Sequence, residues 1–259
     1  MKDILTAPFL TEMIRTVTEM YRHGWDERNG GNISYNVTDK APQLDLLPAL
    51  TEPIAIGMKV PHLKNGYFLV TGTGRRMRYV AERPMDNMSV IRILDDCEHY
   101  VIVTEKVIRP TSELPTHLAV HDSLQTRSPE YKAVIHTHPI ELVALSHCHP
   151  FLGKDVLSLL LWSMIPETRA FCPKGLGIVP YTLPVELARK TLDALKDYDV
   201  VLWEKHGVVA VGPDAIEAFD MIDVLNKSAQ IYRDGRSMGF RPEGMSEDQM
   251  DELKMAFNL

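Results

Sequence analysis

The chain begins with a segment in which apolar residues recur every three or four positions. This spacing places them on one side of a helix, and Arg22, His23 and Gly24 are typical of a helix end. The apolar residues are Phe9, Leu10, Met13, Ile14, Val17, Met20 and Tyr21. Further helices are predicted over residues 112–126, 140–146, 153–164, 185–197 and 213–233. Ser246 followed three residues later by Gln249 resembles a capping box, which predicts a last helix.

Short apolar runs between these helices predict β-strands. They cover residues 33–37, 67–71, 88–94, 99–105, 132–138, 176–181 and two segments within 199–211. Several neighbouring strands are too close in sequence for a crossover helix, so we expect them to pair antiparallel. Residues 39–66 hold four prolines and predict a long excursion with little regular structure. The pattern therefore predicts an α/β fold, a single domain over residues 1–259 with a central, mostly antiparallel sheet flanked by helices.

Composition and charge narrow the classes of function. The 259 residues are 45% hydrophobic, which is enough for a core without disulfides, and the three cysteines are widely spaced. Acidic residues outnumber basic ones, 35 to 28, which argues against a nucleic-acid binder but allows a small anionic substrate. The sequence has no run of about 18 apolar residues and its N-terminus does not resemble a signal peptide. We therefore expect a soluble cytoplasmic protein.

Three histidines form the sharpest chemical signal. His136 and His138 alternate on a predicted strand, so their imidazoles point to one face, and neutral imidazoles suit zinc and similar divalent ions. His206, at a turn between two apolar strands, is a third candidate, and three protein ligands with one open position are typical of a catalytic metal. Two alternatives stay open. The first pair could be a surface group and a packing group, and the His-Cys-His cluster at residues 147–149 could compete as the metal site.

The sequence PTSELP offers a second kind of chemistry. The hydroxyl groups of Thr111 and Ser112, together with free amides at a helix start, are suited to binding an anion. Glu113 is either a catalytic carboxylate or simply a favourable acid in the first helical turn. Glycine turns at residues 30–32 and 71–74 could bring backbone N–H groups close to a phosphate, although most glycine turns hold no ligand. The dinucleotide-binding and P-loop motifs are absent from the sequence.

Taken together, these motifs resemble the class II aldolase and adducin family. The motifs, in the order that this family shows, are WDERNGGN from Trp25, TGTG from Thr71, PTSELP from Pro110, HTH from His136 and HG from His206. The resemblance covers nearly the whole chain. It implies a three-layer α/β fold and a homotetramer with active sites between subunits. It also implies one zinc ion per subunit, bound by His136, His138 and His206.

The same resemblance implies roles for residues around the metal. Glu113 corresponds to the family's catalytic carboxylate, and Glu167 to a second carboxylate that reaches across from an adjacent subunit. Asn29 matches a polar contact to the substrate. The segments that hold the substrate phosphate correspond to Gly31, Asn32, Thr73, Gly74, Thr111 and Ser112. The RRMR stretch at residues 75–78 is more basic than the family leads us to expect, and it either supplements phosphate binding or lies in solvent.

The reaction implied by the resemblance is a reversible aldol cleavage. A ketose 1-phosphate breaks between its third and fourth carbons into dihydroxyacetone phosphate and L-lactaldehyde, through a metal-stabilised enediolate. Glu113 would move the carbon-bound proton, and Glu167 the proton of the hydroxyl that becomes the aldehyde oxygen. The alternatives are a fuculose-phosphate aldolase, a sugar-phosphate 4-epimerase and a non-catalytic, adducin-like interaction domain.

Overall fold

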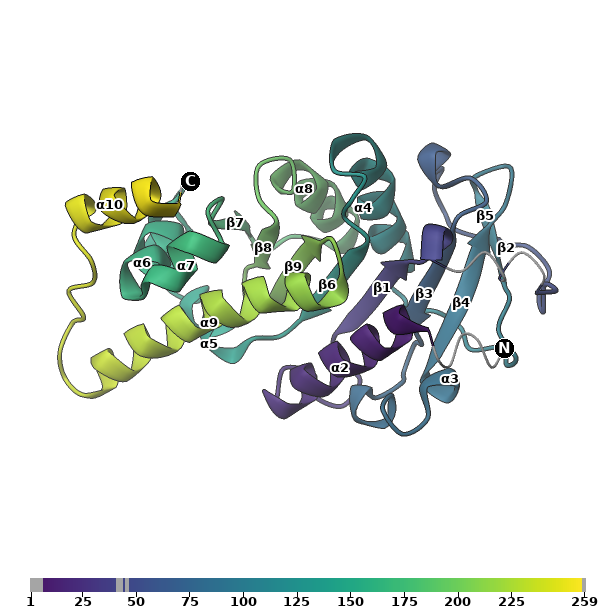
Figure 1. Ribbon diagram of the computed structural model, residues 1–259, viewed down its shortest axis with the longest axis horizontal. Helices are drawn as coiled ribbons and strands as arrows, with labels where there is room; N and C mark the ends of the chain where they lie inside the picture. The colour runs from purple at the N-terminus through teal and green to yellow at the C-terminus, as the bar shows by residue number, and fades with distance from the viewer. Residues whose placement is uncertain (1–6, 41–43, 45–46, 258–259) are drawn as a thin grey trace. The chain divides into compact units, whose positions relative to one another are not determined.

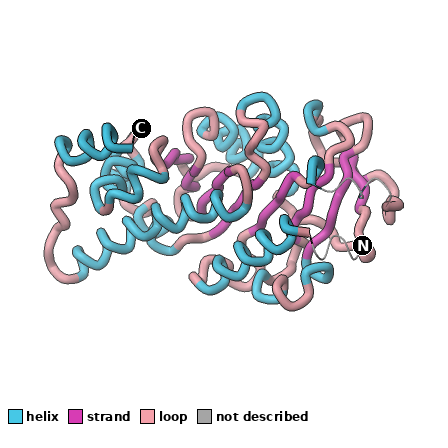
Figure 2. The backbone as a smooth tube through the Cα atoms, viewed as in Figure 1, coloured by secondary structure: helices cyan, strands magenta, loops and turns pink. Residues whose placement is uncertain are grey.

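The computed structural model describes residues 7–40, 44 and 47–257 of the chain. The chain groups into two compact units: Met1–Thr137 with Val211–Ala218, and His138–Ala210 with Phe219–Leu259. Both units combine strands and helices (Figures 1 and 2). Within the described part of the chain, no helix is long and apolar enough to cross a lipid bilayer.

The first unit is built on an antiparallel arrangement of strands. These strands are β1 (Asn32–Asn36), β2 (Ile54–Ala55), β3 (Tyr67–Thr71), β4 (Met88–Ile93), β5 (His99–Ile102) and β6 (Ala133–Thr137). Its helices are α2 (Pro8–Arg22), α3 (Pro84–Asn87) and α4 (Leu114–Arg127), with 3-10 turns η1 (Thr38–Lys40), η3 (Pro61–Leu63) and η4 (Met77–Tyr79). The strand order is β2-β5-β4-β3-β1-β6. Tyr35 of β1 lies opposite Leu69 of β3 on one side and Ala133 of β6 on the other, so β1 is an interior strand.

The two long helices of this unit cover opposite faces of β1. The Ser34 hydroxyl lies 2.7 Å from Nδ1 of His117 and 2.8 Å from Nε2 of His121, both on α4. The next residue, Tyr35, donates its hydroxyl hydrogen to Glu12 of α2 at 2.9 Å. Because successive strand residues point to opposite faces, α4 lies on one side of the sheet and α2 on the other.

Helix α2 confirms the prediction from its apolar spacing. Its buried residues include Phe9, Leu10, Met13, Val17 and Met20. Gly24 follows with a φ of +71°, which is a left-handed conformation that glycine adopts without strain. The N–H groups of Gly24 and Trp25 donate to the carbonyls of Tyr21 and Met20 at 3.0 Å, which closes the end of the helix.

A buried apolar cluster fixes the start of α4 on the sheet. Its members include Phe68, Val70, Ile91, Ile93, Ile102, Leu114 and Leu118. Strands β3, β4 and β5 supply most of these side chains, and the first turn of α4 supplies Leu114. Burial of an aliphatic or aromatic side chain stabilises the folded state by about 1.5–3 kcal/mol. Because Leu114 is buried in this cluster, the preceding residue, Glu113, has a well-defined position.

The second unit contains the remaining strands and most of the remaining helices. The strands are β7 (Leu176–Val179), β8 (Val200–Trp203) and β9 (Gly207–Gly212), and the last two residues of β9 belong to the first unit. The helices are α5 (Ile140–Leu145), η5 (His149–Leu152), α6 (Val156–Met164), α7 (Pro166–Phe171), α8 (Pro184–Ala194), α9 (Ala215–Ser237) and α10 (Glu247–Phe257). Strands β8 and β9 form an antiparallel hairpin, whereas β7 and β8 run parallel and are joined by α8, as a parallel connection requires.

Several boundaries differ from the sequence prediction for local reasons. Strand β6 ends at Thr137, so His138 lies just beyond the strand rather than on it. The predicted helix at Pro213 begins two residues later, because Asp214 accepts the N–H groups of Ile216 and Glu217 at 2.9 Å and caps the helix. The excursion 39–66 includes β2 and η3, and residues 41–43 and 45–46 of it lie outside the described residues.

The capping box at the start of α10 is confirmed. Gln249 accepts the N–H of Ser246 at 2.9 Å, and the Ser246 hydroxyl accepts the N–H of Gln249 at 3.2 Å. Helices α3 and α7, with the sequences PMDN and PETRAF, were not predicted, because each holds too few apolar residues to show a pattern.

Candidate active site

Backbone hydrogen bonds join the TGTG and PTSELP motifs. The N–H of Thr111 donates to the carbonyl of Thr71 at 2.8 Å, and the N–H of Thr73 donates to the carbonyl of Arg109 at 2.9 Å. The end of β3 and the start of α4 therefore lie side by side. The side chains of Thr73 and Ser112 are exposed there, where a ligand can reach them.

Glu113 occupies the cap position of α4, but its carboxylate does not cap the helix. No capping hydrogen bond from this side chain is present. Instead, Nδ2 of Asn32 donates to Oε2 of Glu113 at 3.2 Å. The backbone N–H of Glu113 donates to Oγ1 of Thr111 at 3.3 Å, which fixes the residue independently of its carboxylate. A capping hydrogen bond is therefore not the role of this carboxylate, whereas its favourable position near the positive end of the helix dipole is retained.

Asn32 also connects the glycine turn to the histidine strand. In the sheet register Asn32 lies opposite His136. The preceding Gly31 has a φ of +71°, and a Cβ atom there would lie 3.1 Å from the carbonyl oxygen of His136. Only glycine allows this approach without strain. The Oδ1 atom of Asn32 is buried and, among the described residues, has no hydrogen-bond partner.

The three predicted histidine ligands converge. His136 is buried on β6, His138 is half-buried just after this strand, and His206 is exposed in the turn between β8 and β9. One nitrogen from each imidazole lies within 4.8 Å of the others. Three imidazoles at this spacing form a donor set that suits a divalent ion and leaves a coordination position open, as in catalytic sites. The residues therefore fit the metal that the sequence predicted.

The competing cluster does not show this convergence. Residues 147–149 are exposed at the end of α5, and Cys148 is a free thiol. Within the described part of the chain, the group of three or more potential ligands at metal-binding distance is His136, His138 and His206.

The other predicted site residues lie on accessible turns and helix starts. Asn29 is exposed in the turn before β1. Gly74 is exposed with a φ of +67°, which suits a turn that presents backbone N–H groups. Glu167 is exposed in the first turn of α7 and does not belong to the histidine group.

Two buried histidines behind Glu113 escaped the sequence analysis as site residues. His117 and His121 lie one turn apart on α4 and share the hydroxyl of Ser34. Burial lowers the pKa of His117 to about 4 and that of His121 to about 3, so both imidazoles are neutral near neutral pH. A hydroxyl can donate to one ring nitrogen and accept from the other, and this fixes both rings behind the first turn of α4. The signal that could have found them is the i, i+4 pair of histidines after Glu113.

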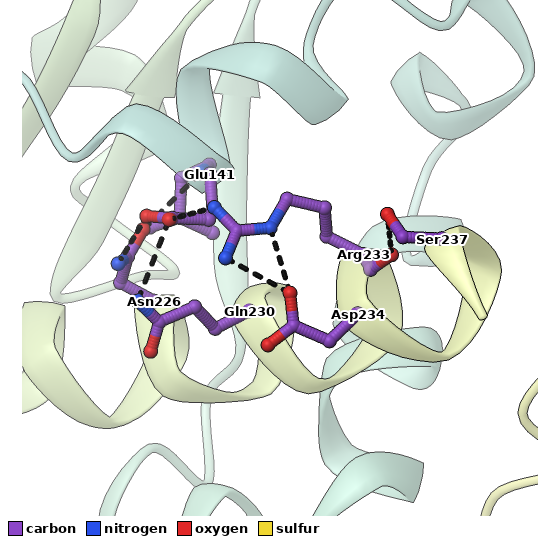
Figure 3. A network of polar contacts seen from close by, with 7 residues as sticks. Glu141, Asn226, Gln230, Arg233, Asp234 and Ser237 are labelled. Atoms are coloured by element: carbon purple, nitrogen blue, oxygen red, sulfur yellow. Dashed lines mark hydrogen bonds and ion pairs between the residues drawn. The ribbon is translucent and has the colours of Figure 1, made fainter.

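A buried carboxylate next to the histidine motif is a further feature that sequence reasoning missed. Glu141, three residues after His138, accepts hydrogen bonds from Nδ2 of Asn226 at 2.8 Å and Nε2 of Gln230 at 3.4 Å, and forms an ion pair with Arg233 (Figure 3). Asn226 also accepts the N–H of Leu142 at 3.2 Å. Helix α9 therefore fixes the start of α5.

Comparison with known proteins gives the class to which this fold and site belong. The family model of the class II aldolase and adducin N-terminal domain matches residues 11–233, and the chain belongs to this family. The predicted fold class is confirmed, since the strand pairs described above are antiparallel except for β7 with β8, and helices flank the strands. Enzymes of the class II aldolase type use a divalent metal, which agrees with the histidine group.

Particular relatives are similar over nearly their full length. A protein from Bacteroides thetaiotaomicron named rhamnulose-1-phosphate aldolase is 55% identical, with 100% of this chain and 99% of that protein covered. A protein of the same name from Enterococcus faecalis is 33% identical, with 99% and 94% covered. The crystal structure of a sugar-phosphate aldolase from Thermotoga maritima has a TM-score of 0.78 at 34% identity and covers 91% of this chain and 98% of its own. A solved L-fuculose 1-phosphate aldolase shares the fold, with a TM-score of 0.62 at 19% identity and 97% and 96% covered.

These similarities identify the chain as an aldolase. Both curated relatives carry an aldolase name, and the matched region spans all the motifs from WDERNGGN to HG.

Proposed function

We propose that this protein is a zinc-dependent aldolase of rhamnose degradation that reversibly cleaves L-rhamnulose 1-phosphate into dihydroxyacetone phosphate and L-lactaldehyde. The observation that carries the proposal is the 55% identity, over the full length of both chains, to a protein named rhamnulose-1-phosphate aldolase. The site geometry supports it, because a half-buried carboxylate, a buried amide and three imidazoles are brought to the same region of the chain.

In this proposal His136, His138 and His206 hold one zinc ion per subunit. When bound, the ion supplies Lewis-acid stabilisation of the negative charge that develops on the substrate oxygens during carbon–carbon cleavage. Three neutral imidazoles suit zinc, and the exposed position of His206 leaves the ion accessible to a substrate.

Glu113 is the proposed general acid and base at the third carbon of the ketose. Its carboxylate accepts a hydrogen bond from Asn32 and is not used for capping, so an oxygen remains available for proton transfer. The hydrogen bond also orients the carboxylate toward the glycine turn. We assign Glu167 the proton of the hydroxyl that becomes the aldehyde oxygen, and Asn29 a polar contact to the substrate.

The substrate phosphate is assigned to the turns that surround Asn32 and Glu113. The residues of this phosphate subsite are Gly31, Asn32, Thr73, Gly74, Thr111 and Ser112. The support is that backbone hydrogen bonds hold the TGTG and PTSELP segments side by side, with Thr73, Gly74 and Ser112 exposed. Such groups at a helix start and in glycine turns are suited to a phosphate dianion.

The proposal includes a homotetramer in which Glu167 reaches the site of an adjacent subunit. An exposed Glu167, outside the metal-binding group of its own chain, agrees with a role across a subunit boundary. Residues 1–259 form one catalytic domain in this proposal, since a single family model matches residues 11–233. A cytoplasmic location belongs to it as well, because a phosphorylated sugar does not cross a membrane unaided.

Product analysis tests the function directly. Zinc-loaded protein is given dihydroxyacetone phosphate and L-lactaldehyde, and the ketose 1-phosphates formed are separated by stereoisomer, with chelator-treated protein as the control. We expect rhamnulose 1-phosphate as the main product. Mainly fuculose 1-phosphate would contradict the named sugar, and epimerisation of a pentose phosphate without cleavage would contradict the aldolase assignment. If neither reaction occurs, the adducin-like interaction domain is favoured.

A further inference from the structure

A basic cavity lies beside the turn that follows β3. Its volume is about 430 Å³, and its walls come from the TGTG turn, η4, α3 and the segment after β5. The lining residues with charged side chains are Arg75, Arg76, Arg83, Lys106 and Asp86. Four cations against one carboxylate form a strongly positive site on a chain with a net charge of −7.

The single carboxylate does not neutralise the cavity. Asp86 forms an ion pair with Lys106. The hydrogen bond from Lys106 lowers the pKa of the Asp86 carboxyl, and the positive charges of Arg83 and Arg75 lower it further. Among the described residues, no carboxylate lies within ion-pair distance of Arg75, Arg76 or Arg83. Arginine presents several N–H donors in a plane and suits the oxygens of a phosphate, so three guanidinium groups offer more than one phosphate contact.

The wall that carries these arginines is fixed by a buried asparagine. Nδ2 of Asn87 donates to the carbonyls of Tyr79 at 3.2 Å and Arg83 at 2.8 Å, which ties η4 to α3. The carbonyl of Asn87 accepts the N–H of Gly72 at 2.8 Å, which ties both to the end of β3. The Arg83 guanidinium also lies 5.6 Å from the centre of the Tyr79 ring, a distance typical of cation–π contacts. The charged side chains therefore stand on a preformed framework.

The cavity differs from the phosphate subsite proposed above. Gly74 belongs to both, but Thr111 and Ser112 are not among the residues that line the cavity. A volume of about 430 Å³ is in the range of small-molecule sites and exceeds the needs of one phosphate.

We propose that this cavity is a second anion site, which binds a small metabolite carrying two phosphate groups. Arg83 and Lys106 hold the part of the ligand that lies farther from the TGTG turn, and Gly74 brings the other part next to the phosphate subsite. Occupancy is therefore expected to affect binding at the phosphate subsite. The proposal stands on the cavity's own residues and does not require the proposed aldolase activity.

Titration calorimetry of the zinc-loaded protein tests the site, with fructose 1,6-bisphosphate as the probe and fructose 6-phosphate as its monophosphate counterpart. We expect the bisphosphate to bind more tightly than the monophosphate. The double variant Arg83→Gln/Lys106→Gln should weaken bisphosphate binding about tenfold or more, because two cations are lost and the charge of Asp86 is no longer offset by Lys106. The charge-retaining variant Arg83→Lys/Lys106→Arg should restore most of the affinity.

The matched control removes two charges elsewhere. Arg15 on α2 and Lys227 on α9 are exposed and lie outside the cavity, so Arg15→Gln/Lys227→Gln should bind the bisphosphate as the wild type does. Ser112→Ala separates the two phosphate sites. If Ser112→Ala weakens binding as much as the cavity variant does, the probe occupies the phosphate subsite and the proposal is wrong. Wild-type affinity in the folded cavity variant would also overturn it.

Discussion

The Glu113 carboxylate stands at the first turn of α4 yet makes its described contact with Asn32 rather than with the helix. This distinction separates two explanations for an acid at a helix start. A capping acid stabilises the helix, whereas a carboxylate that accepts a hydrogen bond from Asn32 is held in place for the proton transfer proposed for Glu113.

Glu113→Gln is therefore expected to keep the fold and the metal but lose turnover by about 10²–10⁴-fold, because the general base is removed. Proton exchange at dihydroxyacetone phosphate measures this step without the aldehyde. Glu217→Gln, the same change at an exposed position in the first turn of α9, should exchange at the wild-type rate. Wild-type exchange by Glu113→Gln would end the assignment.

Behind Glu113, the histidines that share Ser34 make the stability of the fold sensitive to acid. Burial lowers the pKa of both imidazoles in the folded state, to about 4 for His117 and about 3 for His121. Below the unfolded value of about 6.5, the unfolded chain therefore binds more protons than the folded chain. The stability that these groups contribute is present above this value and is lost as the pH falls toward the folded pKa.

Between about pH 7.5 and about pH 5.5, each of these histidines should lower the free energy of unfolding by about 1–1.5 kcal/mol. The replacement His121→Gln keeps a hydrogen-bonding group near Ser34 but does not titrate. Between these two pH values, the free energy of unfolding of this variant should therefore fall by about 1–1.5 kcal/mol less than that of the wild type. Urea unfolding with chelator present at both pH values measures the difference. The exposed His149→Gln serves as the control, and equal losses in His121→Gln and wild type would contradict the prediction.

At the scale of elements, the proposed metal site depends on a strand end and a hairpin turn. Strand β6 carries His136, the chain leaves the strand before His138, and the β8–β9 turn supplies His206. A strand and a tight turn hold their side chains more rigidly than a long loop does, which suits a catalytic metal.

His136→Ala should deplete the bound metal strongly, as measured by metal analysis of the purified protein. His149→Ala removes an exposed imidazole from the competing cluster and should leave occupancy unchanged. The fold should be affected less than the activity, because a core of this size does not depend on metal for folding. Full occupancy in His136→Ala with depletion in His149→Ala would show that the cluster at residues 147–149 binds the metal instead.

The periodic pattern predicted those elements whose apolar side chains face a core. Helix α2 shows its burial in the spacing of its apolar residues, and strand β3 shows it in a continuous apolar run. Helices α3 and α7 hold few apolar residues and strand β2 spans only two residues, so no pattern appears in their sequences. The end of strand β6 at Thr137 was missed because alternation of residue types does not mark where a strand stops.

The candidate site also contains features that the sequence predicted and features that it could not predict. His136, His138 and Glu113 stood out because chemistry-bearing residues interrupt apolar segments or begin a helix. The hydrogen bond between Asn32 and Glu113 could not be predicted, because it joins residues 81 positions apart. Only the tertiary fold brings such partners together.

At the scale of the whole molecule, the proposed role of Glu167 requires another subunit. Phe171, on the same helix, exposes 64% of its surface, and large exposed apolar residues often mark interfaces. If a neighbouring subunit completes the active site, two chains that are inactive for different reasons can restore activity when they assemble in one oligomer.

Co-expression of Glu113→Gln and Glu167→Gln chains is expected to restore activity. If Glu167 acts across a cyclic interface, about a quarter of the sites in randomly mixed oligomers contain both wild-type carboxylates. Separately purified variants, mixed just before the assay, provide the control without subunit exchange. Activity in the co-expressed sample no higher than in this mixture would contradict a contribution in trans.

The buried Glu141 has a consequence for how the protein is made. Its partner Asn226 follows 85 residues later, and a ribosome that adds roughly 5–20 residues per second needs about 4–17 seconds to reach it. During this interval the start of α5, three residues after His138, has a carboxylate without the amide that holds it in the finished protein. Assembly of this segment therefore waits for the synthesis of α9, and a nascent chain that stalls before residue 226 retains an unanchored histidine segment.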